Sequence, residues 1–295
     1  MTRDDVLEVL GVTAWDAPTE PAQSARAVAA LEGGRVLFFP FLAFALEEGE
    51  KRFLTAEALG QGRKNISLDP ASGVCQGSRF TGAEAAALGA MLERFGRQAE
   101  ALVLALAPGY AGRLERARTS FRPAEIEDRT SSVRKDDRLL HVDAFPTRPT
   151  GGKRILRVFS NIAPDGVERL WRVGEPFADF ARQFFPRVGA GAAGAAWILE
   201  RLGLTKGRRS AYDTIMLGLH DRMKEDQAYQ TGAPAAEVSF PPGTSWMVYT
   251  DQVLHAALAG RFALEQTFHL PVAAMADATR APISVLERLA GRALA

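Results

Sequence analysis

The sequence is poor in cysteine and histidine, with one cysteine and four histidines among its 295 residues. The single thiol, Cys75, excludes an intrachain disulfide, so we expect a protein of a reducing compartment such as the cytoplasm. The histidines are His141, His220, His255 and His269. Any imidazole-based metal site must therefore be built from these four side chains.

The chain also lacks a strong charge excess and a long apolar segment. Its formal net charge is +1, so no global field favours nucleic acid or a membrane as a partner. The longest apolar run, residues 36–46, is interrupted by Pro40 and is too short for a transmembrane helix. The acidic start of the sequence, MTRDD, is not typical of a signal peptide. We therefore expect any membrane contact to be peripheral.

What the sequence does contain is a succession of helical and strand-like patterns. Apolar spacing predicts helices over 1–32 and 82–106, and residues 107–138, rich in Arg, Ser, Thr and Asp, predict a loop. From residue 139 the pattern changes to short strands between turns that contain Pro and Gly. The predicted strands are 139–144, 155–161, 168–173, 237–240, 244–250 and 262–270. Further helices are predicted over 176–184, 192–202, 214–226 and 282–294.

Short strands framed by helices favour a β-barrel or a double-sheet jelly roll with helical buttresses. We expect residues 139–272 to form this β core, interrupted by helical insertions. The N-terminal helices are expected to pack on the core, so that residues 1–295 make a single domain.

Two of the histidines lie in contexts that suit a metal ion. His141 and Asp143 form an H-x-D pattern on a predicted strand, where residues i and i+2 point to the same face. His255 follows the predicted strand 244–250 and a polar turn. Two histidines and one carboxylate on one face are the ligands of non-haem iron(II) oxygenases, with the other positions open for oxygen and a bidentate co-substrate. The same residues would suit zinc in a hydrolase, or would be ordinary hydrogen-bonded histidines.

An oxygenase of this kind must also bind the distal carboxylate of 2-oxoglutarate, for which a guanidinium offers paired donors. Arg261 is the first candidate, because it follows His255 and precedes the last predicted strand. Arg157 is the second, because a charge inside strand 155–161 must be paired or bind an anion when it is buried. Asn161 shares a strand face with Arg157, where its amide would bind co-substrate or sugar. Basic side chains that would suit an anionic sugar substrate cluster in two places. These are Arg148, Lys153, Arg154 and Arg157, and Arg201, Lys206, Arg208 and Arg209.

The region around His141 resembles a known family. Residues 134–146, RKDDRLLHVDAFP, resemble the signature of the Kdo hydroxylases, where Kdo is 3-deoxy-D-manno-oct-2-ulosonic acid. The resemblance continues in RPT at 148–150, RILRVF at 154–159, WRVGEPF at 171–177, LHDRMK at 219–224 and the segment from His255 to QTF at 266–268. It extends over most of the chain, and the long stretch around His141 is much more specific than H-x-D alone.

The resemblance implies an Fe(II)- and 2-oxoglutarate-dependent dioxygenase of Gram-negative bacteria, which uses O2 and has ascorbate as an accessory reductant. The family's metal triad corresponds to His141, Asp143 and His255. The expected fold is α+β, with a double-stranded β-helix (jelly-roll or cupin-like) core and flanking helices. The alternatives to this interpretation are a zinc-dependent hydrolase and a non-catalytic sugar-binding barrel.

The resemblance also implies a substrate and a place in the cell. Such an enzyme hydroxylates C3 of Kdo in the lipopolysaccharide inner core, giving D-glycero-D-talo-oct-2-ulosonic acid (Ko). The Kdo is attached to lipid A or its precursor, and nucleic acid is not a partner. We therefore expect a cytoplasmic protein in peripheral contact with the cytoplasmic face of the inner membrane.

Overall fold

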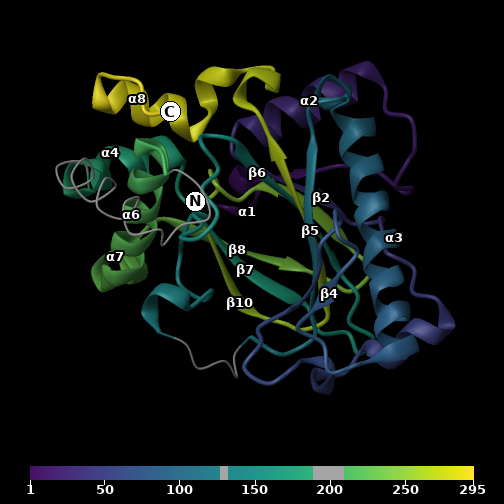
Figure 1. Cartoon of the computed structure of the whole chain (residues 1–295). Coiled ribbons are helices and arrows are strands. Elements are labelled where there is room, and N and C mark those ends of the chain that lie inside the picture. The colour runs from purple at the N-terminus through teal and green to yellow at the C-terminus, as the bar shows by residue number, and fades with distance from the viewer. Residues whose placement is uncertain (127–131, 189–208) are drawn as a thin grey trace.

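The computed structural model describes residues 1–126, 132–188 and 209–295. Figure 1 shows a central β structure with the long helix α3 along one side and helices α4, α6, α7 and α8 grouped on another. The chain therefore has an α+β architecture, as expected. Among the helices in the described ranges, none combines the length and the apolar character needed to span a bilayer.

The larger sheet has eight strands in the order β1-β2-β9-β6-β11-β5-β3-β4. In that order the strands are β1 (Leu7–Val9), β2 (Val36–Phe39), β9 (Ser245–Tyr249), β6 (Arg154–Asn161), β11 (Ala263–Leu270), β5 (Glu115–Arg122), β3 (Ile66–Leu68) and β4 (Cys75–Gln76). All neighbours are antiparallel except β1 and β2. Every residue of the central strand β6 is buried, because both faces of the sheet are covered there.

The smaller sheet has three antiparallel strands in the order β10-β7-β8. They are β10 (His255–Ala259), β7 (Arg169–Gly174) and β8 (Ala235–Phe240). Beyond β10, a single antiparallel bridge joins His141 to His255. This bridge attaches the segment that carries the H-x-D pattern to the open edge of the smaller sheet.

The helices surround these two sheets. They are α1 (Arg3–Val6), α2 (Pro21–Glu32), α3 (Gly82–Leu106), α4 (Phe177–Val188), α6 (Ala211–Glu225), α7 (Gln227–Gly232) and α8 (Pro282–Ala290). Short 3-10 helices cover Glu48–Phe53, Ala56–Ala58, Pro108–Tyr110, Val133–Lys135, Val272–Ala274 and Ala278–Arg280. α3 is rich in Ala and Leu, which favour helix, and Pro108 follows directly after its C-cap.

Two apolar cores lie on the two faces of the larger sheet. On one face, Phe95 and other buried residues of α3 pack against Phe121 and Phe268. On the other face, between the two sheets, lies a smaller aromatic core that contains Phe159, Trp171 and other buried side chains. The metal-ligand candidates lie beside this second core, at one end of the space between the sheets.

Several predicted elements coincide with those observed. The predicted helix 82–106 is α3, and five of the six predicted strands correspond to β6, β7, β8, β9 and β11 within a few residues. Helices 176–184 and 214–226 correspond to α4 and α6, and 282–294 is the shorter α8. The predicted helix 192–202 lies outside the described residues.

Three predictions are wrong. Residues 1–32 are not helical throughout, because Leu7–Val9 pair with β2 as a strand. Residues 107–138 are not all loop, because Glu115–Arg122 form β5 inside the larger sheet. The predicted strand 139–144 is reduced to one bridging residue, His141. In each case pairing with a neighbouring strand, which local sequence does not reveal, decides the conformation.

Candidate metal centre

His141, Asp143 and His255 converge at one point. One ligand atom from each residue lies within 4.8 Å of the other two. The Nε2 atom of His141 lies 3.9 Å from Oδ1 of Asp143, and the centroids of the two imidazole rings are 4.5 Å apart. The convergence follows from the backbone, because His141 and His255 bridge each other and the Asp143 N–H donates to the Thr250 carbonyl.

Hydrogen bonds fix the orientation of both imidazoles. Nδ1 of His141 donates to the Leu139 carbonyl, and Nδ1 of His255 donates to the Val253 carbonyl, each at 2.8 Å. A carbonyl oxygen only accepts, so both Nδ1 atoms carry the proton and both Nε2 atoms keep a lone pair. This is how backbone carbonyls commonly prepare histidines to bind a metal.

The protonation states also suit a metal ion. Burial lowers the pKa of His141 and of His255, which favours the neutral rings. Burial would raise the pKa of Asp143, but the guanidinium of Arg157 outweighs it and holds that pKa well below its usual range. Two neutral imidazoles and one carboxylate are the donor set that divalent iron takes in oxygenases. The three residues therefore fit such an ion.

Arg157 links the triad to a buried chain of charges. Its Nη2 lies 2.9 Å from Oδ2 of Asp143, and its Nη1 donates to Oε1 of Glu265 at 2.7 Å. On the other side of Glu265, the guanidinium of Arg122 binds Oε2 at 2.7 Å. The charges alternate in sign along this chain, so each buried carboxylate is balanced by a guanidinium.

A cavity of about 260 Å³ opens in front of the triad. On one wall, the ring of Trp171 stacks on His255 with centroids 5.2 Å apart, and Phe159 meets Trp171 edge to face. Arg169 also lines this cavity and is nearly fully buried. Its Nη1 donates to the carbonyl of Gly260. The cavity thus joins the metal-ligand candidates to aromatic and cationic side chains.

The three predicted co-substrate residues lie in different places. Arg157 lines the cavity beside Asp143. Arg261 is at the surface, where it pairs with Asp165, and it is not among the cavity-lining residues. Asn161 is buried and donates to the carbonyls of Val167 and Phe240, so its amide supports the fold. The roles assigned to Arg261 and Asn161 therefore stay predictions that no contact supports.

Sequence analysis did not single out Arg122, Arg169 or Glu265. All three line the cavity, although they come from β5, β7 and β11, far apart along the chain. Charged residues inside strands were the available signal, because a buried charge needs a partner. Of the basic cluster at 148–157, Lys153 pairs with Glu115 at the surface, whereas the other members are buried or lie near the site. Of the second basic cluster, positions 201, 206 and 208 lie outside the described residues.

The turn before His255 is held by a second buried ion pair. Arg154 donates to Asp251 at 2.7 Å and to the side chain of Gln252 at 2.6 Å, and all three side chains are buried.

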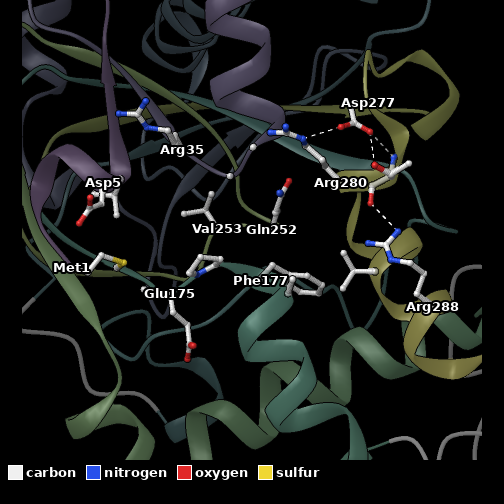
Figure 2. A pocket seen from close by; sticks show the side chains of 18 residues that line it. Met1, Asp5, Arg35, Glu175, Phe177, Gln252, Val253, Asp277, Arg280 and Arg288 are labelled. Atoms are coloured by element: carbon white, nitrogen blue, oxygen red, sulfur yellow. Dashed lines mark hydrogen bonds and ion pairs between the residues drawn. The ribbon is translucent and has the colours of Figure 1, made fainter.

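Another cavity, shown in Figure 2, has a volume of about 420 Å³, and its lining includes Gln252. Its Arg280 pairs with Asp277, so this cavity contains its own counter-charge.

Comparison with known proteins gives a consistent result. The family described as 3-deoxy-D-manno-oct-2-ulosonic acid (Kdo) hydroxylase matches residues 14–293. A structure of the Kdo hydroxylase KdoO, a non-haem Fe(II) α-ketoglutarate-dependent dioxygenase in complex with α-ketoglutarate and Fe(III), has 43% identity and a TM-score of 0.94. Its cobalt(II) complex and its apo form have 44% identity and the same TM-score. Each match covers 98% of this chain and 97% of the other. No curated protein is significantly similar to this chain.

Proposed function

This chain belongs to the Kdo hydroxylase family, and we propose that it is an Fe(II)- and 2-oxoglutarate-dependent dioxygenase that hydroxylates C3 of Kdo to give Ko. The observation that carries the proposal is the convergence of His141, Asp143 and His255 beside a cavity. These residues would hold Fe(II), leaving the cavity side for 2-oxoglutarate and O2. The bound iron and co-substrate supply the oxidising power that inserts one oxygen atom into a C–H bond, with succinate and CO2 as co-products.

The protein's own contribution is to fix the ligands and to limit access of water. The carbonyls of Leu139 and Val253 aim the two imidazoles, and Arg157 keeps Asp143 ionised and holds the carboxylate in place. The aromatic wall of Phe159 and Trp171 shields one side of the cavity. Positioning and exclusion of water are the tasks of such a site, because the oxidant must meet one C–H bond.

We propose that Arg169 binds the distal carboxylate of 2-oxoglutarate. Both terminal nitrogens of Arg157 are occupied by Asp143 and Glu265, so a further carboxylate there would compete with two others. Arg169 lies two residues from Trp171 on the same face of β7, about 7 Å along the strand. It also donates to the carbonyl of Gly260, the residue directly before Arg261, which was the first candidate from the sequence.

A matched pair of substitutions tests this assignment. Arg169→Gln should raise the KM for 2-oxoglutarate about tenfold or more, because hydrogen bonds between charged groups are worth about 1.5–3 kcal/mol. Arg261→Gln, which alters a surface pair, should leave that KM within about twofold. Equal KM values for the two variants would contradict the role of Arg169.

We further propose that the two sheets form a double-stranded β-helix within a single domain. The aromatic core that contains Phe159 and Trp171 fills the space between the sheets. The bridge from His141 to His255 supplies the edge position that a fourth strand would take in the smaller sheet. The other core joins residues from Leu10 to Leu294, which supports one domain.

For the acceptor we propose Kdo linked to lipid A or its precursor. The family description supports a Kdo-containing substrate, and Kdo occurs in lipopolysaccharide on its lipid anchor. The protein would then act in the cytoplasm, in peripheral contact with the cytoplasmic face of the inner membrane.

Two experiments test the activity and the acceptor separately. Anaerobic addition of Fe(II) and 2-oxoglutarate to the purified protein should produce a weak visible charge-transfer band, and its absence would refute the cofactor assignment. Mass spectrometry of Kdo–lipid A from cells with and without the gene should show a gain of one oxygen. An unchanged inner core would refute the acceptor while leaving the cofactor result intact.

A further inference from the structure

A second cleft adjoins the catalytic cavity on the same face of the larger sheet. Its volume is about 310 Å³, within the usual range for small-ligand pockets. The cavity and the cleft have five lining residues in common: Asn65, Arg122, Phe145, Arg157 and Glu265. The two spaces are therefore adjacent, and an acceptor large enough to reach both would place one group at the metal centre and another in the cleft.

The floor of the cleft is a polar stripe across strands β3, β5 and β11. Ser67 is paired with Ser120, and Ser120 is paired with Glu265, so the three side chains lie in a row. Asn65 donates to the hydroxyl of Ser120, and Thr267 follows Glu265 on the same face of β11. A row of hydroxyl groups on a sheet face contributes little to an apolar core, but it offers hydrogen bonds to a polar ligand.

The cleft has a marked excess of positive charge. Four of its lining residues are arginines, and its one carboxylate, Glu265, already balances Arg122 and Arg157. Among the described residues, Arg118 pairs with Asp69 at 3.9 Å, a long distance for an ion pair, and its buried Nε has no hydrogen-bond partner. Arg148 is exposed and has no ion pair or hydrogen bond within the described parts of the chain. The outer end of the cleft therefore presents two guanidiniums, of which Arg118 has a long ion pair and Arg148 has none in the described part of the chain.

We propose that this cleft binds an anionic group of the acceptor, a carboxylate or a phosphate, that lies next to the ring being oxidised. The inference rests on the proposed function and names the recognition element of the acceptor. Arg118 and Arg148 would bind the anion, and the hydroxyls of Ser67, Ser120 and Thr267 would bind neighbouring oxygens. Guanidiniums are suited to this because they match carboxylate and phosphate oxygens with paired donors.

The position of the cleft separates it from the co-substrate. Along β11, Thr267 and His269 lie about 7 and 14 Å beyond Glu265, and Thr267 is paired with Arg157 of β6 in the larger sheet. The proposed 2-oxoglutarate residue, Arg169, comes instead from β7 in the smaller sheet, on the opposite wall. A ligand in the cleft would thus contact the larger sheet, across from Arg169, and we assign it to the acceptor.

Steady-state kinetics with a Kdo-bearing lipid A precursor test the proposal. Arg118→Gln and Arg148→Gln should each raise the KM for this acceptor about tenfold, while the KM for 2-oxoglutarate and the charge-transfer band stay unchanged. The control is Arg182→Gln, an exposed arginine of α4 paired with Asp179, which should change neither KM. A KM for 2-oxoglutarate that rises in place of that for the acceptor would overturn the proposal.

Chemically altered acceptors identify the anion. If it is a phosphate, removing the phosphates should weaken wild-type binding about tenfold and leave the Arg118→Gln variant unaffected. If it is a carboxylate, methyl esterification of the Kdo carboxylates should instead weaken wild-type binding about tenfold and leave the Arg118→Gln variant unaffected. Equal losses for wild type and variant with both altered acceptors would show that the cleft binds neither group, and the proposal would fail.

Equilibrium binding keeps this test independent of turnover. Calorimetric titration of the metal-free protein with the acceptor should show a Kd about tenfold weaker for Arg118→Gln than for wild type, with Arg182→Gln unchanged. If the enzyme shows no turnover but Arg118→Gln still binds the acceptor about tenfold more weakly, the hydroxylase proposal is refuted and the proposal for the cleft stands. Normal turnover with identical Kd values would refute the cleft and retain the hydroxylase.

Discussion

The buried pair of Arg154 and Asp251 gives a sharp test of how the metal site is supported. Both side chains are essentially inaccessible, at 0% and 1% exposed. Arg154 donates to Asp251 and Gln252 and lies over the ring of Tyr249, 3.8 Å from its centroid. Removing the guanidinium by Arg154→Met leaves the carboxylate of Asp251 buried without its counter-charge.

The size of the effect follows from that isolation. Removing one partner of a buried ion pair costs about 3–5 kcal/mol, so Arg154→Met and Asp251→Asn should each lower the free energy of unfolding by this amount. Independent effects would sum to about 6–10 kcal/mol, which approaches the whole stability of a typical domain. The double variant leaves no buried charge, so we expect it to lose about as much as either single variant.

Urea unfolding of the wild type, both single variants and the double variant measures this coupling. Burial already raises the pKa of Asp251, although Arg154 opposes this shift. Without Arg154 the folded state binds the proton more tightly than the unfolded state, so stability should increase as the pH falls toward about 4. Additive losses, or an Arg154→Met variant whose stability does not depend on pH, would refute the reasoning.

The same variants should also affect the metal. Asp251 lies in the turn whose carbonyls hold two ligands, since Thr250 accepts from the Asp143 N–H and Val253 accepts from His255. Loss of such outer contacts commonly weakens metal affinity about 10–100-fold. Titration of Fe(II) under conditions where Arg154→Met remains folded should detect that change. An unaltered Fe(II) affinity would show that the ion pair does not support metal binding.

Three further substitutions give direct expectations. His255→Ala should abolish succinate formation while circular dichroism shows a folded chain, and residual turnover would remove His255 from the ligand set. Gly260→Ala should lower the free energy of unfolding by about 1–3 kcal/mol, because φ at this position is +107° and the added Cβ would lie 2.7 Å from the Glu168 carbonyl oxygen. Thermal melting measures this loss. Trp171→Leu removes the ring stacked on His255, and a Fe(II) titration should show weaker binding with the fold retained.

How much of this site is visible in the sequence differs from element to element. The H-x-D pattern places His141 and Asp143 together because two residues on one extended segment are neighbours whatever the fold. His255 is 112 residues beyond Asp143, and only the register of β10 brings it there. β10 itself, HAALA, is short and rich in alanine, so local sequence gives little strand signal and pairing with β7 decides its conformation.

Strand β5 shows why the remaining part of the site was missed. Its sequence, ERARTSFR, has charged or polar residues at six of eight positions, which is typical of a loop when judged by composition. In the sheet, however, its alternate residues have different surroundings: Phe121 packs in the core with α3, whereas Arg118, Ser120 and Arg122 line the cleft. When one face of a strand carries charged side chains and the other is only partly apolar, the sequence no longer alternates clearly between apolar and polar residues. That alternation is the signal by which strands are predicted. The conformation predicted from local sequence therefore differs from the observed one in β5, the strand rich in arginine. Such a difference is expected where residues serve binding rather than packing.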